Sequence, residues 1–211
     1  MIFKIEMLAD DFLEKAFKEA LEELNKFYEI NWVHHLPQLI IVPDRKTINA
    51  LKGKTTELWN TGWSDGRVNF ILERSVYEKE SGKKYSDKYY LAEVKHELSH
   101  SFCFVIHGRA DHFPVWFSEG LAIYTSGQLV FHKSLKEFKN FLSFFNKGGA
   151  GVYAESGFVL ELLIKHFGKE KILDLLKGTS AVKTEKDFEN LFESIYKFKL
   201  SYEEFNKLLL N

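Results

Sequence analysis

The pentad His96-Glu97-Leu98-Ser99-His100 constrains the fold of this chain more than any other segment. Two histidines four positions apart lie one turn apart on an α-helix, where both imidazoles can face one metal ion. A glutamate between them is placed to take a proton from a water molecule at that ion. The pentad therefore predicts a helix that carries two zinc ligands, His96 and His100, and a general base, Glu97.

The residues around the pentad favour one long helix. Ser86 is a suitable N-cap and Gly108 a suitable end, so we expect the helix to run from about Asp87 to His107. An apolar stripe, expected to be buried, consists of Leu91, Val94, Leu98, Phe102 and Val105. A second stripe consists of His96, His100, Cys103 and His107. The two pentad histidines are therefore expected to point together, away from the apolar stripe.

A third ligand is needed, because a catalytic zinc site usually combines three protein side chains with one water molecule. The segment Trp116-Phe117-Ser118-Glu119-Gly120-Leu121-Ala122 provides Glu119, with 18 residues between it and His100. Pro114 suits the first turn of a helix and Gly127 its end, which places Glu119 in mid-helix. We therefore expect His96, His100 and Glu119 to bind one zinc ion per chain. The alternatives for a place at the metal pocket are Cys103, His107 and His112.

These two segments resemble the gluzincins, the metallopeptidases that combine His-Glu-x-x-His with a Glu on a following helix. The sequence WFSEGLA is similar to the Trp-x-x-Glu-Gly-x-Ala of the peptidase MA-like group related to aminopeptidase N, at the same 18-residue separation. The resemblance extends more weakly from Pro37 to about Leu210. It implies a zincin-like α+β fold, a zinc cofactor and hydrolysis of peptide bonds.

The resemblance also bears on the remaining site residues. Gluzincins commonly use a Tyr or His from the helical half to stabilise the oxyanion, and Tyr153 opens a stretch similar to their Tyr-x-x-Ser. Packing at a helix start is the alternative role for Tyr153, and Tyr124 is the next candidate donor. The stretch from Thr61 to Arg67 lacks the Met and Glu with which aminopeptidase N relatives bind a free amino end. Cleavage within a chain is therefore expected.

The wider pattern predicts a single catalytic domain over residues 1–211, with a sheet-containing half at 1–107 and a helical half at 108–211. Strands are expected at 38–42, 57–63 and 67–72, with a turn at 64–66. Helices are expected at 10–28, 46–51, 133–145, 153–167, 170–176, 184–196 and 202–210. The 67–72 strand is expected to be an edge strand that pairs with an extended peptide substrate. An internal strand without a free edge is the alternative.

Composition limits the partners. The 29 Lys and Arg residues are interspersed among 30 Asp and Glu residues, so no nucleic-acid partner is expected. No apolar run is long enough to span a membrane, and the first 11 residues do not have the pattern of a signal peptide, which favours a cytoplasmic location. The predicted function is that of a zinc metallopeptidase acting on peptides or proteins. The alternative is a zinc-bound peptide- or protein-binding module with weak catalysis.

Overall fold

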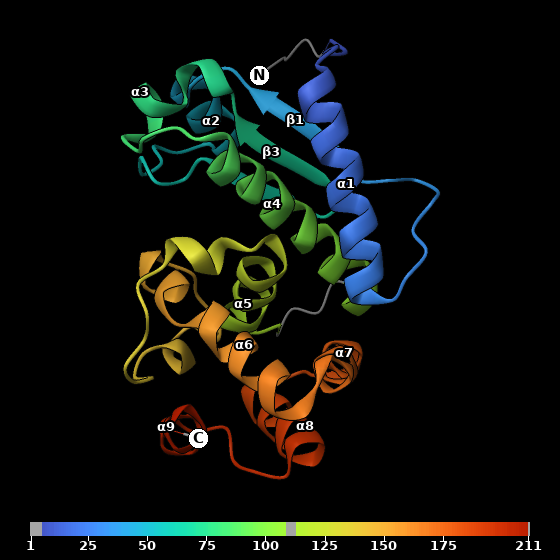
Figure 1. Ribbon diagram of the computed structural model, residues 1–211, viewed down its shortest axis with the longest axis vertical. Coiled ribbons are helices and arrows are strands. Elements are labelled where there is room, and N and C mark those ends of the chain that lie inside the picture. The colour runs from blue at the N-terminus through green and yellow to red at the C-terminus, as the bar shows by residue number, and fades with distance from the viewer. Residues whose placement is uncertain (1–5, 109–112, 211) are drawn as a thin grey trace.

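The computed structural model describes residues 6–108 and 113–210, and a sheet with its helices forms the upper half of Figure 1. The strands are β1 (Gln38–Val42), β2 (Gly62–Asp65) and β3 (Val68–Leu72). The α-helices of this half are α1 (Asp11–Tyr28), α2 (Arg45–Lys52), α3 (Tyr77–Ser81) and α4 (Asp87–His107). The helices of the lower half are α5 (Val115–Ser126), α6 (Ser156–Phe167), α7 (Lys169–Gly178), α8 (Glu185–Tyr196) and α9 (Tyr202–Leu209). Short 3-10 helices include η2 (Gln128–Phe131) and η4 (Ala150–Ala154).

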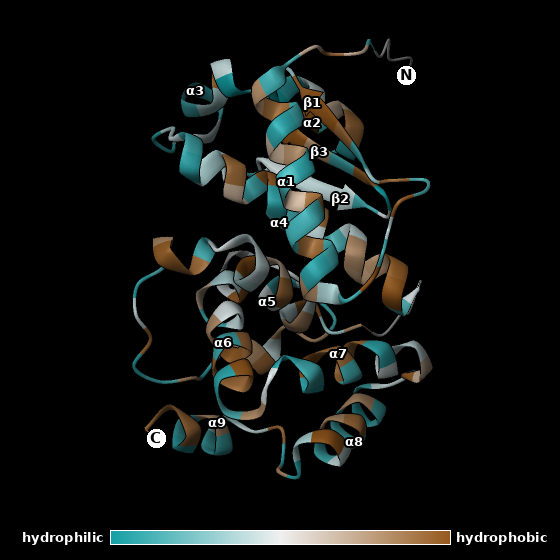
Figure 2. Ribbon diagram, turned by 45° about the vertical axis from the view of Figure 1, so that its right-hand side comes forward, coloured by the Kyte–Doolittle hydropathy of each residue, from teal (hydrophilic) through white to brown (hydrophobic). Residues whose placement is uncertain are grey.

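The sheet is small and mixed. Its strand order is β1-β3-β2, with β1 parallel to β3 and β2 antiparallel to it. Figure 2 shows the hydrophilic residues of α1 facing outward, with the hydrophobic residues of β1 behind them. This arrangement confirms the predicted α+β class, in which a small mixed sheet precedes a mostly helical half.

Helix α4 is fixed against both the sheet and α1. The Tyr90 hydroxyl donates a hydrogen bond to the Leu72 carbonyl oxygen at 2.9 Å, and the Ser101 hydroxyl donates to Asn69 Oδ1 at 3.0 Å. The predicted stripe is buried at Val94, Leu98 and Phe102. Val105 was expected to be buried as well, but it is 44% exposed because it lies near the end of α4, beyond the packed region.

Two glycines bring α5 and α6 unusually close together. A Cβ at Gly120 would lie 2.4 Å from Leu160 Cδ2 and 2.6 Å from the Ser156 carbonyl oxygen. A Cβ at Gly157 would lie 2.4 Å from Ile123 Cγ2. Helix α5 is therefore held firmly by the helical half, and one hydrophobic core continues through both halves. Within residues 6–108 and 113–210, no helix combines the length and the apolar character needed to cross a membrane.

The predicted helix at 133–145 is wrong. Phe138, Phe141 and Phe145 are buried, so their spacing of three and four correctly identified core residues. The backbone N–H groups of residues 139–141 do not form a helix, because they donate hydrogen bonds to the Glu155 carboxylate at 2.9–3.1 Å. Glu155 is itself buried, and these bonds satisfy its charge. The segment therefore wraps around a carboxylate that local periodicity does not reveal.

The predictions for the second and third strands need two corrections. The chain at 57–60 is a loop rather than a strand, because the Arg45 guanidinium binds the carbonyl oxygens of Glu57, Leu58 and Asn60. Strand β2 therefore begins only at Gly62, and the turn into β3 lies at Gly66 and Arg67. The strand expected at the edge, β3, is the central strand. The edge strand beside α4 is β2.

Candidate metal centre and active-site pocket

The first part of the site comes from α4. Ser86 caps this helix by accepting a hydrogen bond from the Tyr89 N–H at 3.2 Å, and the helix ends at Gly108, as predicted. Because His96 and His100 lie one turn apart, their Nε2 atoms approach to 3.2 Å. His96 is buried, and His100 is partly buried.

The second part of the site comes from α5. Pro114, expected in the first turn, is the N-cap one position before this helix, and Gly127 ends the helix with a φ of +74°, as predicted. Glu119 Oε2 lies 3.2 Å from His96 Nε2 and 3.7 Å from His100 Nε2. The structure therefore brings the three predicted metal ligands together.

The other imidazole nitrogens are held by hydrogen bonds that the sequence did not predict. His96 Nδ1 lies 2.8 Å from Gln128 Oε1, and His100 Nδ1 lies 3.0 Å from the Ser118 hydroxyl. Because the amide oxygen of Gln128 can only accept, His96 must donate from Nδ1, which leaves the lone pair of Nε2 facing Glu119 in the neutral ring. Bonds of this kind orient metal-binding histidines.

The arrangement fits a tetrahedral zinc ion. Zinc–ligand bonds of roughly 2.0–2.1 Å place neighbouring ligand atoms about 3.3–3.5 Å apart. The observed separations of 3.2, 3.2 and 3.7 Å bracket that range. In addition, Glu119 Oε2 is buried and makes no hydrogen bond of normal geometry among the described residues, and it forms an ion pair with His96 Nε2 at 3.2 Å only when that ring is protonated. Such a buried acceptor is costly unless a cation satisfies it.

Comparisons with protein-family models, curated proteins and solved structures find no match. The interpretation of the site therefore depends on its geometry and its electrostatics.

The charge states of the candidate ligands are coupled, because a carboxylate and two imidazoles lie close together. Without a metal ion, burial lowers the pKa of His96, but the nearby Glu119 and Glu97 outweigh burial and raise this pKa to about 9. Burial raises the pKa of Glu119, but His100 and His96 hold it well below its usual range. Glu119 is thus ionised at neutral pH, as a metal ligand must be.

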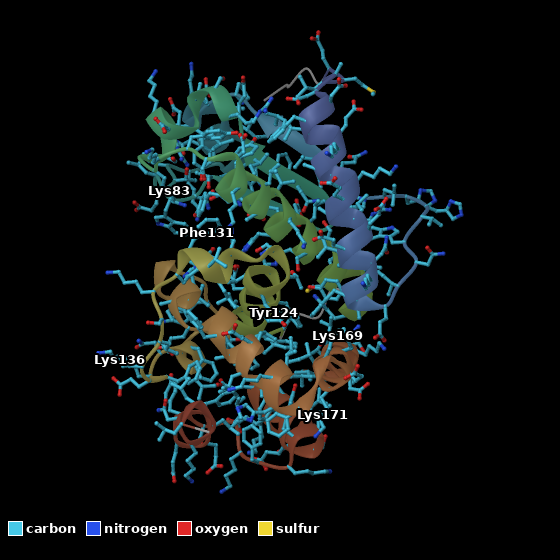
Figure 3. All side chains as sticks on the ribbon, viewed as in Figure 1. Lys83, Tyr124, Phe131, Lys136, Lys169 and Lys171 are labelled. Atoms are coloured by element: carbon cyan, nitrogen blue, oxygen red, sulfur yellow. The ribbon has the colours of Figure 1, made fainter. Side chains whose placement is uncertain are left out.

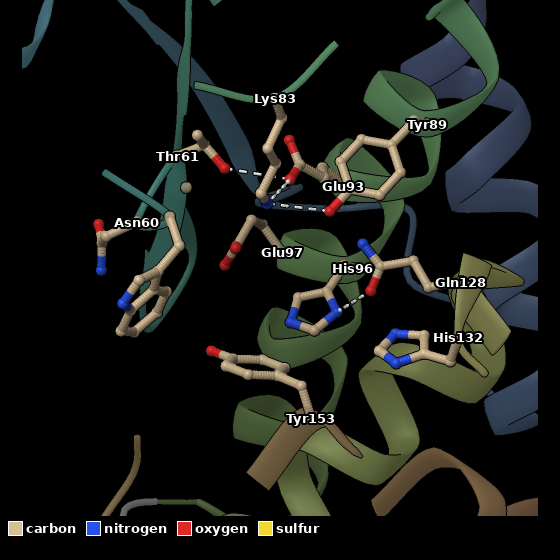
Figure 4. A pocket seen from close by; sticks show the side chains of 12 residues that line it. Asn60, Thr61, Lys83, Tyr89, Glu93, His96, Glu97, Gln128, His132 and Tyr153 are labelled. Carbon is tan, nitrogen blue, oxygen red and sulfur yellow. Dashed lines mark hydrogen bonds and ion pairs between the residues drawn. The ribbon is translucent and has the colours of Figure 1, made fainter. Parts of the chain in front are cut away.

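Glu97 lies in the wall of a pocket of about 280 Å³, which Figure 4 shows with His96 beside it. A Cβ at Gly62 would lie 2.9 Å from Glu97 Oε1, so the absence of a side chain at Gly62 makes room for the carboxylate. Burial raises the pKa of Glu97, although His96 and His100 oppose this effect. A carboxylate with a raised pKa is a stronger base than an exposed one.

Tyr153, the predicted oxyanion donor, lines the same pocket. It lies in η4, immediately before α6, and its ring contacts the rings of Trp59 and His96 at centroid distances of 6.0 and 6.3 Å. Burial, together with the charges of Glu119 and Glu97, raises the pKa of the Tyr153 phenol. The hydroxyl is therefore protonated at neutral pH and can donate a hydrogen bond.

Several alternatives raised by the sequence lie outside the pocket. Cys103 is buried against Tyr28, with its sulfur 3.4 Å from the phenol oxygen, and burial raises the pKa of its thiol to about 12. His107 stacks on Phe113 at a centroid distance of 4.1 Å. Tyr124 contacts Phe27 and lies apart from Lys83 and Phe131 in Figure 3. His112 is outside the described residues.

Other residues in the pocket wall had no supporting pattern in the sequence. His132, which no pattern in the sequence singled out, lines the pocket beside Gln128 because η2 turns the chain back toward α4. Lys83, Tyr89 and Glu93 line another part of the wall. Glu93 precedes His96 by three positions, so helical spacing could have placed it on the same side of α4.

Proposed function

We propose that this protein is a zinc-dependent metallopeptidase of the gluzincin type, which hydrolyses bonds within peptide or protein chains. The observation that carries the proposal is the convergence of His96 Nε2, His100 Nε2 and Glu119 Oε2 at 3.2–3.7 Å. The buried Glu97 carboxylate lies in the adjoining pocket. A mixed sheet with an antiparallel edge strand beside the pentad helix supports a zincin-like fold.

The proposed chemistry divides among a few groups. Zinc held by the three ligands would act as a Lewis acid and lower the pKa of a water molecule toward about 7. Glu97 takes the proton of the attacking water at its carboxylate and then passes it to the departing amine. The Tyr153 hydroxyl donates a hydrogen bond to the substrate carbonyl oxygen as that oxygen gains negative charge. Gln128 and Ser118 keep the two imidazoles oriented.

Strand β2 is the proposed binding edge for the substrate backbone. Among the described strands, β2 pairs only with β3, so its other edge is unpaired. Gly62, at the start of β2, adjoins Glu97. An extended peptide that adds to this edge would therefore pass the catalytic carboxylate, and main-chain hydrogen bonds would hold it. We therefore assign to β2 the pairing with substrate that was expected for the strand at 67–72.

Two variants test the proposal. Purified protein should contain one zinc ion per chain and should cleave a quenched fluorogenic peptide, with activity lost to a chelator and restored by zinc. Glu119→Ala should weaken zinc retention by orders of magnitude, because two ligands remain. Glu97→Gln should keep zinc and the fold but lose nearly all hydrolysis, because an amide does not accept the proton.

The same experiment separates this function from a zinc-bound binding module. A binding module would retain zinc and bind peptides without turnover, and Glu97→Gln would change nothing. Full zinc in Glu119→Ala would remove Glu119 from the ligand set. Wild-type rates in Glu97→Gln would overturn the mechanism.

A further inference from the structure

A charged cluster forms the part of the pocket wall that lies toward the start of α4. It consists of Lys83, Tyr89 and Glu93, whose side chains meet above Glu97 in Figure 4. Glu93 precedes Glu97 by one turn of α4, whereas His100 follows Glu97 by about one turn. The cluster and His100 therefore lie on opposite sides of Glu97 along the helix axis.

Two hydroxyl groups, rather than Lys83, supply the shortest hydrogen bonds to the Glu93 carboxylate. The Tyr77 hydroxyl donates a hydrogen bond to Glu93 Oε2 at 2.6 Å, and the Thr61 hydroxyl donates to Glu93 Oε1 at 3.1 Å. The ammonium of Lys83 lies farther away, 3.4 Å from Glu93 Oε1. The buried carboxylate therefore does not require the full hydrogen-bonding capacity of Lys83.

Lys83 retains donor capacity that faces the pocket. An ammonium group has three N–H donors, and the Tyr89 hydroxyl accepts one of them at 3.0 Å. The side chain of Lys83 is 36% exposed, compared with 10% for Glu93, so the positive member of the pair is the one presented to a ligand. Burial lowers the pKa of Lys83, but Glu93 and Tyr89 outweigh burial and raise it, so the amine stays charged.

From this arrangement we infer that Lys83 binds a carboxylate of the substrate and makes the peptidase selective for acidic groups. The selectivity in cleavage depends on the proposed function, whereas the binding of a carboxylate by Lys83 does not. Zinc would offset the charges of Glu97 and Glu119, and Lys83 is the one Lys or Arg among the described residues that line the pocket. The carboxylate belongs either to an Asp or Glu side chain near the scissile bond or to the C-terminus of a short peptide.

The dimensions of the pocket agree with this role. Glu93 and Glu97 are four positions apart on the helix, which corresponds to a rise of about 6 Å. Successive Cα atoms of an extended substrate are about 3.8 Å apart, so the side chain of a neighbouring residue can cover that distance. A volume of about 280 Å³ lies near the lower end for ligand pockets, which suits one side chain or a terminal residue rather than a large group.

Matched peptides test the inference by binding. The probe protein is zinc-loaded Glu97→Gln, and calorimetry measures the dissociation constants of alanine-based peptides with Glu or Gln at each position in turn. A second pair compares a short alanine peptide with a free C-terminal carboxylate and its C-terminal amide. We expect about 10- to 100-fold tighter binding of the carboxylate form in one of the two series, the range for a charge-assisted hydrogen bond. The series that shows the difference identifies the source of the carboxylate.

Added substitutions assign the effect to Lys83. Lys83→Met should reduce the ratio between carboxylate and amide forms to near one, and Lys83→Arg should retain part of it. Lys84→Met, next in the chain but exposed and outside the pocket wall, should retain it fully. If Lys83→Met does not fold, Lys83→Gln provides the same test, because it keeps a donor for Tyr89 without the charge.

The outcomes separate this inference from the proposed function. Equal binding of both forms, or a preference that persists without the Lys83 charge, would overturn the inference even if the wild-type protein cleaves peptides. A preference that depends on Lys83 would support it, even if the wild-type protein shows no turnover and the proposed function fails.

Discussion

Gly62→Ala should separate catalysis from metal binding and folding. The added Cβ would lie 2.9 Å from Glu97 Oε1 and 3.1 Å from both Glu97 Cγ and the Phe70 carbonyl oxygen. Ordinary contacts of a Cβ begin at 3.4 Å, so the carboxylate must move by about 0.5 Å or more. It is the end of a flexible side chain, whereas the Phe70 carbonyl belongs to the central strand. The carboxylate is therefore the group that moves.

The expected loss is in the chemical step. Misplacement of a catalytic group by about 1 Å costs on the order of 100-fold in rate, so Gly62→Ala should lower kcat/KM by about 10- to 100-fold. Zinc content should stay at one ion per chain, because no ligand is displaced. The change in Tm should be a few degrees at most, since the carboxylate can relocate and alanine has lower conformational entropy than glycine in the unfolded chain.

The assay compares cleavage of a quenched peptide, zinc content and Tm in the same preparations. Gly148→Ala is the matched control, because its Cβ would meet only Val115 Cγ1, at an ordinary 3.7 Å. It should behave like the wild-type protein in all three measurements. Wild-type kcat/KM in Gly62→Ala would refute the placement of Glu97 as the base, and loss of zinc would show that Gly62 supports the metal centre instead.

Three further predictions follow from contacts in and near the site. Tyr153→Phe should lower kcat by about 10- to 1,000-fold with KM little changed, because the oxyanion contact forms only in the transition state; unchanged kcat would leave Tyr153 a packing role. Gln128→Leu should weaken zinc binding by about 10- to 100-fold in competition with a chelator, because His96 Nδ1 loses its acceptor. Burial lowers the pKa of the His107 imidazole to about 4, below its unfolded value of about 6.5. The neutral ring should therefore contribute to stability above about pH 6.5, and this contribution should be lost as the pH falls toward 4. His107→Phe should remove about 1 kcal/mol of this pH dependence in denaturant titrations, a value reduced for the partly exposed ring.

The helices that carry the candidate ligands were predictable because their signals are local. Ser86 and Gly108 delimit α4, Pro114 and Gly127 delimit α5, and the four-residue spacing of the histidines determines their relative direction. Each signal operates within a few residues of its element, so one sequence is sufficient to read it. The approach of Glu119 to the histidines has no local signal, and it was expected from the need for a third zinc ligand and from the resemblance to gluzincins.

Features that depend on distant pairing were not predictable in the same way. The spacing of the phenylalanines at 138–145 is helical, but the Glu155 carboxylate binds the backbone that a helix would need. The order of strands in the sheet depends on which strands pair with each other, and β3 pairs with both β1 and β2. Gln128 reaches His96 across 32 positions, without any repeating pattern that marks the contact.

The pocket wall draws on more parts of the chain than the candidate ligands do. His96, His100 and Glu119 belong to two consecutive helices, whereas the wall combines residues of α4 with residues from the loop at 59–61, from Gly62, from Lys83, from η2 and the residue after it, and from η4. Substitutions in those loops can alter the shape and charge of the pocket without touching a ligand, and loops tolerate such change better than packed helices. Under the proposed function, this architecture would allow substrate preference to diverge during evolution while the candidate ligands stay the same, and those loops would be the first targets for engineering a new specificity.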